Sequence, residues 1–160
     1  QTDLASVYLL KNTAEADKQA FDLLTKAARK NQSNAMITLA TLYSRGIGVE
    51  KRDPESAVVL LHRAARLRNP NAPWPLAQHY FERATNSETN EVDFTLGVQT
   101  LYWLTLTTKF DQDPEHRADA RLMALKLNEI NPNMNLRLKK WLRTSKEPPP
   151  LSYDLSQPQS

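Results

Sequence analysis

Two stretches of the chain repeat each other: AFDLLTKAARKNQSNA at residues 20–35 and AVVLLHRAARLRNPNA at residues 57–72. They share an alanine, a Leu-Leu pair, Ala-Ala-Arg, an asparagine and a final alanine, each displaced by 37 positions. A second pattern, Leu-Ala-x-x-Tyr, recurs at a similar period and ends at Tyr8, Tyr43 and Tyr80. A period in the mid-thirties with two such patterns per unit predicts stacked helix-turn-helix repeats.

The spacing of apolar residues within each stretch predicts helices. In the second stretch the apolar positions fall at i, i+3, i+4, i+7 and i+8, namely Ala57, Leu60, Leu61, Ala64 and Ala65. That spacing draws one apolar stripe along a helix, whereas a half-buried strand would show alternation. Because one pair of such helices would leave this stripe exposed, each unit is expected to stack on the next.

The segment YSRGIGVEKRDPESA, residues 43–57, contains two of the three glycines and joins two predicted helices. A phosphate-binding loop would need a preceding strand and either Gly-x-Gly-x-x-Gly or Gly-Lys-Ser/Thr, and neither is present. We expect Gly46 to end the first helix in a left-handed conformation. Asp53 is expected to cap the next helix, with Pro54 at its first position.

These residues carry a family resemblance over about residues 4–84. The pattern consists of Tyr43-x-x-Gly46-x-Gly48-Val49, followed by Asp53, Ala57, Leu61, Ala64-Ala65 and Ala72. It resembles a Sel1-like repeat, a relative of the tetratricopeptide repeats with a longer loop between its helices. The resemblance implies an α/α solenoid that binds proteins or peptides and has no catalysis of its own. Such proteins often work in bacterial envelope, secretion or signalling systems.

We therefore predict an all-α fold, a right-handed solenoid of about three Sel1-like repeats within residues 1–146. The third unit diverges, with its second helix at residues 92–109, and further helices are expected at residues 113–130 and 135–146. The tail at residues 147–160 contains four of the ten prolines and few apolar residues, so we predict that it is disordered. It is either a linker or a short binding motif.

Composition argues against several kinds of function. The chain has no cysteine, and its three histidines, His62, His79 and His116, fall in different predicted helices without metal-ligand spacing. We therefore expect no metal, no cofactor and no catalytic residues. The net charge is only +3, and no basic stripe runs along the chain, so nucleic acid is not an expected partner.

The first helix of each unit in such solenoids lines the concave face, so its non-packing residues are candidates for partner binding. In the second unit they are Asn34, Ile37, Thr41 and Arg45, and in the third they are Trp74, Gln78, Phe81 and Glu82. Aromatic and aliphatic groups among polar ones are typical of an interface centre. The alternative is that Trp74 and Phe81 are buried against the C-terminal helices.

A second candidate surface lies in NLRLKKWLRTSK, residues 135–146. Its possible contact residues for a membrane or partner are Arg137, Lys139, Lys140, Trp141 and Arg143. Such a helix could rest on an anionic membrane, or it could cap the solenoid with its apolar side inward. Family habit and a start at Gln1 in place of Met lead us to expect the bacterial periplasm or cell envelope, with the cytoplasm as the alternative.

Overall fold

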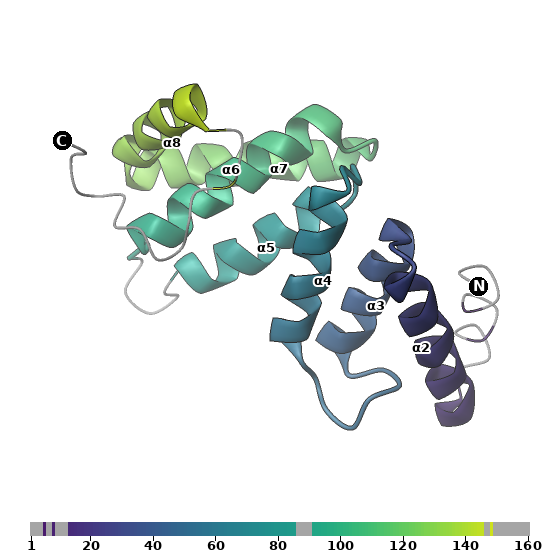
Figure 1. Cartoon of the computed structure of the whole chain (residues 1–160). Coiled ribbons are helices and arrows are strands. Elements are labelled where there is room, and N and C mark those ends of the chain that lie inside the picture. The colour runs from purple at the N-terminus through teal and green to yellow at the C-terminus, as the bar shows by residue number, and fades with distance from the viewer. Residues whose placement is uncertain (1–4, 6–7, 9–12, 86–90, 146–147, 149–160) are drawn as a thin grey trace. The chain divides into compact units, whose positions relative to one another are not determined.

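The computed structural model describes residues 5, 8, 13–85, 91–145 and 148, which are helical apart from loops and a single bridge between Thr85 and Val92 (Figure 1). The chain divides into two compact units, residues 1–72 and 73–160. Unit 1 contains α2 (Ala14–Arg29), α3 (Ser33–Arg45) and α4 (Pro54–Arg66). Unit 2 contains α5 (Pro73–Ala84), α6 (Phe94–Phe110), α7 (Pro114–Ile130) and α8 (Pro132–Thr144). The all-helical prediction is confirmed for these residues.

Small side chains hold the core of unit 1 together. In this unit α3 packs against both α2 and α4. The alanines of the repeated pattern, including Ala27, Ala35 and Ala64, are completely buried. Because alanine occupies little volume, the helices approach closely, and larger residues such as Leu24 and Met36 fill the remaining space. This packing explains why alanine recurs at a fixed offset in the sequence.

The helices α2, α3 and α4 end in the same backbone motif. A residue with a left-handed conformation lies one or two positions after each helix: Asn31 (φ 58°), Gly46 (φ 73°) and Arg68 (φ 58°). The next amide then donates back to a carbonyl five residues earlier, at 3.2 Å for Gln32 to Ala27, 2.9 Å for Ile47 to Leu42 and 3.1 Å for Asn69 to Ala64. This is the Schellman arrangement, and it satisfies carbonyls that the helix leaves free. The sequence repeat therefore extends to the backbone.

The loop between α3 and α4 confirms the expected bend. Gly46 ends α3, and Asp53 caps α4 by accepting a hydrogen bond from the Ser56 amide at 3.0 Å, with Pro54 at the first helical position. The Ser56 hydroxyl donates to the second carboxylate oxygen at 2.6 Å. These hydrogen bonds, the one from the hydroxyl first, hold the pKa of Asp53 below its usual value because they stabilise the charged form.

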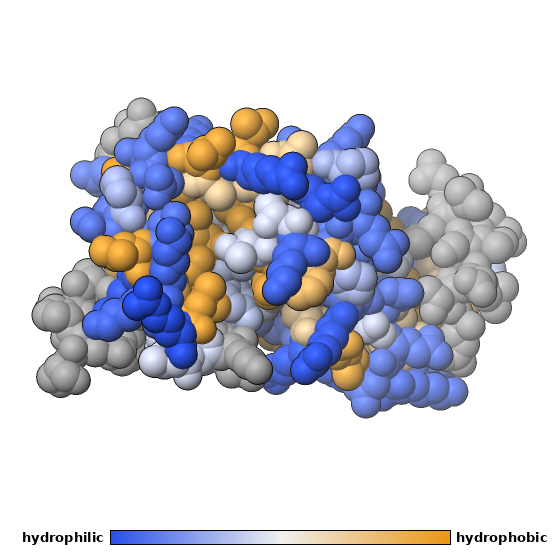
Figure 2. All heavy atoms as spheres, turned by 90° about the horizontal axis from the view of Figure 1, so that it is seen from above, coloured by the Kyte–Doolittle hydropathy of each residue, from blue (hydrophilic) through white to orange (hydrophobic). Residues whose placement is uncertain are grey.

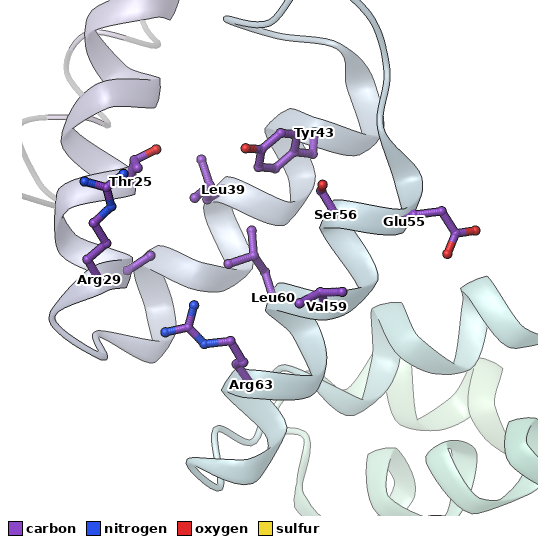
Figure 3. A pocket seen from close by; sticks show the side chains of 10 residues that line it. Thr25, Arg29, Leu39, Tyr43, Glu55, Ser56, Val59, Leu60 and Arg63 are labelled. Atoms are coloured by element: carbon purple, nitrogen blue, oxygen red, sulfur yellow. The ribbon is translucent and has the colours of Figure 1, made fainter. Parts of the chain in front are cut away.

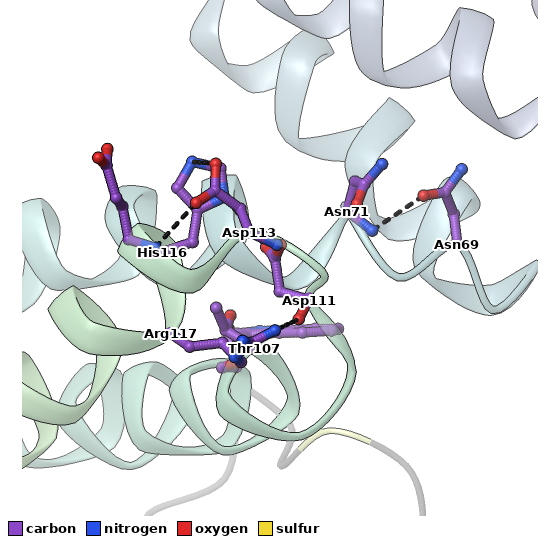
Figure 4. Close-up of polar contacts among 9 residues, drawn as sticks. Asn69, Asn71, Thr107, Asp111, Asp113, His116 and Arg117 are labelled. Atoms are coloured by element: carbon purple, nitrogen blue, oxygen red, sulfur yellow. Dashed lines mark hydrogen bonds and ion pairs between the residues drawn. The ribbon is translucent and has the colours of Figure 1, made fainter.

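A buried asparagine ties the end of α4 to the start of α3. The amide nitrogen of Asn69 donates to the Ser33 hydroxyl at 2.9 Å and to the Asn34 side-chain oxygen at 2.6 Å. Its oxygen accepts from the Asn71 amide at 3.0 Å (Figure 4). Asn69 is only 8% exposed, so these bonds compensate for burying a polar side chain.

In unit 2, α6 is the central helix and packs against α5, α7 and α8. Its buried residues include Thr100 and Thr107, whose hydroxyls donate to the carbonyls of Leu96 (2.8 Å) and Trp103 (3.0 Å). These threonines can be buried because the helix itself supplies the acceptor for each hydroxyl. The predicted helix at residues 92–109 is therefore confirmed within two residues.

The two C-terminal helices follow strong start signals. Asp113 caps α7 through the Glu115 amide at 2.8 Å, and Asn131 caps α8 through the Asn133 amide at 3.1 Å. The start of α8 lies three residues earlier than predicted, because Pro132 occupies the first helical position, where its missing N–H costs nothing. The predicted disordered tail lies outside the described residues except for Pro148, and the boundary near residue 146 stays a prediction.

Candidate functional site

An open cavity of about 450 Å³ lies in unit 1 between α2 and α4, with α3 as its floor (Figure 3). We call it the unit 1 groove. Its lining residues are Thr25, Ala28 and Arg29 from α2, Leu39 and Tyr43 from α3, and Glu55, Ser56, Val59, Leu60 and Arg63 from α4. The groove therefore combines side chains from both repeats of the unit.

Local packing explains why this groove is hollow and largely apolar. Both α2 and α4 pack against α3, and short side chains such as Ala28 and Ser56 line the space between α2 and α4. Leu39 is buried beneath this space, whereas Val59 stands on its wall with 60% of its surface exposed. An apolar floor with an exposed apolar wall offers contact area to a hydrophobic side chain from outside.

Polar groups border the apolar surface, and one of them has no hydrogen-bond partner among the described residues. The Thr25 hydroxyl oxygen is buried without a hydrogen-bond partner among the described residues. Arg63 makes one long hydrogen bond, 3.4 Å, to the Asn31 side-chain oxygen, and Ser56 is occupied by Asp53. Buried polar groups are normally paired in folded proteins. The Thr25 hydroxyl is an exception to this rule, but its oxygen is not exposed to the groove.

The partner-binding residues predicted on α3 do not line this groove. On a helix, Asn34, Ile37, Thr41 and Arg45 lie about 160–240° around the axis from Leu39, which forms the floor. Two of them have internal roles, since Asn34 accepts from Asn69 and Ile37 packs against the core of unit 1. Thr41 and Arg45 are exposed. Their role in partner binding stays a prediction.

The partner-binding residues predicted on α5 also divide into exposed residues and residues with internal contacts. Gln78 and Glu82 are exposed and Phe81 is partly exposed. Trp74 is only 9% exposed, and its ring stacks on His116 of α7 with the centroids 5.2 Å apart. The structure thus supports the alternative interpretation of Trp74, burial against a C-terminal helix, because stacking removes its ring from solvent.

In α8, apolar residues form a buried side and most of the basic residues are exposed. Met134 and Leu138 are buried, and Trp141 and Arg137 are partly buried. Lys139, Lys140 and Arg143 are exposed. The apolar stripe that could have touched lipid thus faces largely inward, as the capping alternative predicts, while Lys146 lies outside the described residues.

A polar cluster at the start of α7 went unrecognised in the sequence. The carboxylate of Asp111 is buried and lies 3.1 Å from Nδ1 of His116, while the Asp111 carbonyl accepts from Arg117 at 2.7 Å (Figure 4). Asp113 lies 3.7 Å from Nε2 of the same histidine. The cluster closes the turn between α6 and α7. Among the described residues no group of three or more His, Cys, Asp or Glu is arranged to hold a metal ion.

The groove was also missed, although one signal pointed to it. Val59 is apolar yet lies on the side of α4 opposite the stripe formed by Ala57, Leu61 and Ala64. Single exposed apolar residues are common on protein surfaces, so this signal alone could not identify the groove. The arrangement offers binding surfaces, and none of the described helices is long and apolar enough to cross a membrane.

Comparisons with known proteins identify the repeats. The model of the Sel1 repeat family matches residues 6–32 and 33–69. No curated protein is significantly similar to the chain. Among solved structures, the chain is similar to c5321, a protective antigen present in uropathogenic Escherichia coli strains that displays an SLR fold. The TM-score is 0.54 at 19% identity, and the match covers 91% of this chain but only 32% of that protein.

The two matched segments coincide with the repeat found in the sequence. The second segment, residues 33–69, contains α3, the glycine loop and α4. The family model does not extend to the third predicted unit, so a count of three repeats stays a prediction. The chain therefore contains two recognised Sel1 repeats within residues 6–69.

Proposed function

We propose that this protein is a non-catalytic scaffold that holds a partner protein or peptide in the unit 1 groove. Sel1 repeats generally mediate protein–protein interaction, which supports the class of function. The observation that carries the proposal is the groove itself, an open cavity of about 450 Å³ with an apolar floor and a hydroxyl without a partner among the described residues. An open trough between helices suits an extended chain.

The groove also explains how a small repeat unit can bind selectively. Its apolar floor accepts a buried anchor side chain, which typically supplies most of the binding energy in an interface. Its polar rim can satisfy the partner's backbone, so the complex leaves few unpaired groups. The residues predicted on α3 and α5, around Thr41 and Gln78, do not line the groove and remain part of the proposal as secondary contacts.

The setting of the protein is a further part of the proposal. We place it in the bacterial periplasm or cell envelope, where it would serve as a subunit of an envelope or secretion assembly. The usual setting of Sel1-like repeat proteins in bacterial envelope and secretion systems supports this proposal, and the cytoplasm is the alternative. A compartment-specific reporter fused to the chain, such as one active only outside the cytoplasm, tests it in the native host.

One observation favours a second function, contact between α8 and an anionic membrane. Leu136 is 66% exposed and shares the outer side of α8 with Lys139, Lys140 and Arg143. Figure 2 shows that hydrophobic residues stand between strongly hydrophilic ones on the face drawn there. Exposed leucine among cations is typical of helices that rest on anionic lipid. Co-sedimentation with phosphatidylserine vesicles at low salt tests this function.

Two exposed apolar residues of α4 allow a matched test of the main proposal. Val59 lies in the groove wall and is 60% exposed, and Leu67 follows the same helix outside the groove and is 47% exposed. Val59→Asp should abolish capture of the partner from the native source, whereas Leu67→Asp should preserve it. Both variants should keep the wild-type melting temperature within a few degrees, since neither side chain is in the core. Equal capture by wild type and Val59→Asp would contradict the proposal.

A further inference from the structure

The charges on the groove walls indicate what kind of peptide it binds. Resting on the proposed function, we propose that the unit 1 groove selects a segment carrying a carboxylate next to an aliphatic side chain. The carboxylate would lie between Arg29 and Arg63, and the aliphatic group would pack on Leu39, Leu60 and Val59. Asp, Glu and a free chain end are equivalent sources of this carboxylate, because all three present the same two oxygens.

Two arginines border the groove from opposite walls. Arg29 projects from α2 and Arg63 from α4, and both line the cavity (Figure 3). Neither guanidinium forms an ion pair with a carboxylate among the described residues. The one acidic lining residue, Glu55, points away from the cavity in Figure 3. Two cations that face one cavity, whose acidic lining residue turns its carboxylate away, favour a negatively charged ligand and disfavour a basic one.

Arginine suits this role for geometric reasons. Its planar guanidinium presents several N–H donors in a fixed fork that matches the two oxygens of a carboxylate. The apolar floor beside it lowers the local polarity and so strengthens a charge-assisted bond relative to one in open water.

A simpler role for these cations is stabilisation of helix ends. Arg29 lies in the last turn of α2 and Arg63 in the last turn of α4, where a positive charge offsets the helix dipole. The chain contains a control for this role, because Arg66 also lies in the last turn of α4 but does not line the groove. If these arginines act only through the helix dipole or the net charge, substitution of Arg66 should weaken binding as much as substitution of Arg63. If they contact the ligand, substitution of Arg66 should have no such effect.

Selection from random peptides tests the proposal with the full chain. One phage library displays internal peptides and a second displays peptides with free carboxyl ends, which separates side-chain from terminal carboxylates. Enriched peptides should carry an acidic group beside Leu, Ile or Val. Synthetic copies, measured by fluorescence anisotropy, should bind at least tenfold more weakly to Arg63→Glu and Arg29→Glu, and within twofold of wild type to Arg66→Glu. Replacing the acid by its amide should weaken binding to wild type but not further to Arg63→Glu.

Other outcomes separate the two proposals. If peptides lose binding to Val59→Asp but not to the groove arginine variants, the groove stands and the carboxylate proposal fails. Enrichment of basic or uncharged peptides, or equal losses for Arg63→Glu and Arg66→Glu, overturns the carboxylate proposal as well. Peptides insensitive to Val59→Asp, or the absence of any enriched peptide, overturn both. Thermal melts of each variant confirm that folding is retained.

Discussion

The loop glycines of unit 1 allow a quantitative test of how one repeat packs on the next. Gly48 has φ +72°, and a Cβ at this position would lie 2.8 Å from the Asp17 carbonyl oxygen and 2.9 Å from Cβ of Phe21, both on α2. A left-handed conformation costs an L-residue about 1–2 kcal/mol. Overfilling a packed contact costs about 1–3 kcal/mol more. The stiffer unfolded chain of an alanine variant offsets about 0.4–1 kcal/mol. We expect Gly48→Ala to destabilise unit 1 by about 2–4 kcal/mol.

Gly46→Ala is the matched control for this prediction. Gly46 has nearly the same φ, +73°, but its Cβ would meet Cγ of Arg52 at 3.1 Å, an atom of a flexible side chain. The backbone strain should therefore remain while most of the contact penalty disappears, which leaves a cost of about 1 kcal/mol. The difference between the two variants isolates the contact between the loop and the preceding repeat.

Urea unfolding followed by circular dichroism measures both variants. The midpoint for Gly48→Ala should fall clearly below that for Gly46→Ala, with similar slopes, because the folded surface is the same. Equal midpoints would refute the reasoning, since they would show that the loop does not rest on α2.

Three further predictions concern a helix end, a buried aromatic residue and a cap. Arg68→Gly should stabilise unit 1 by about 0.5–1 kcal/mol in urea unfolding, because glycine adopts φ 58° without strain; a loss of stability would contradict it. Trp74→Ala should destabilise unit 2 by about 3–5 kcal/mol by removing a buried ring that stacks on His116, and an unchanged melting temperature would show that the ring is not packed. The pKa of Asp53 is lowered from 3.8, so its contribution to stability is present above that value and is lost as the pH falls through the lower folded pKa. The stability difference between wild type and Asp53→Asn should therefore shrink below pH 3.8 in acid titrations, and a constant difference would contradict the lowered pKa of the Asp53 carboxyl group.

The local structure of unit 1 was predictable because each signal acts within a few residues. Gly46 and Asp53 determine where helices end and begin through their own backbone and side chain, so no distant information is needed. The alanine pattern predicted close packing of helices for the same reason. The start of α8 was misplaced because Pro132 was not recognised as an initiating residue.

The candidate site was less predictable because it depends on which helix faces are left uncovered. The periodicity of apolar residues in α3 identified the side of the helix that packs. The groove, however, is lined by two residues of that side, Leu39 and Tyr43, together with residues of the neighbouring helices α2 and α4. Side-chain pairs distant in sequence, such as Trp74 with His116 or Asn69 with Asn34, have no local signature. Their contacts became visible only with the three-dimensional arrangement within each unit.

Site-specific photocrosslinking in the native host tests the central claim most directly. Benzoylphenylalanine placed singly at Val59, Thr41, Gln78 and Lys140 samples the groove, the two predicted faces and α8, all at positions that are exposed. We predict that a partner protein crosslinks at position 59 and that the adduct disappears when Arg63→Glu is added. A partner that crosslinks at position 41, 78 or 140 and not at position 59 would contradict the assignment of the unit 1 groove as the binding site.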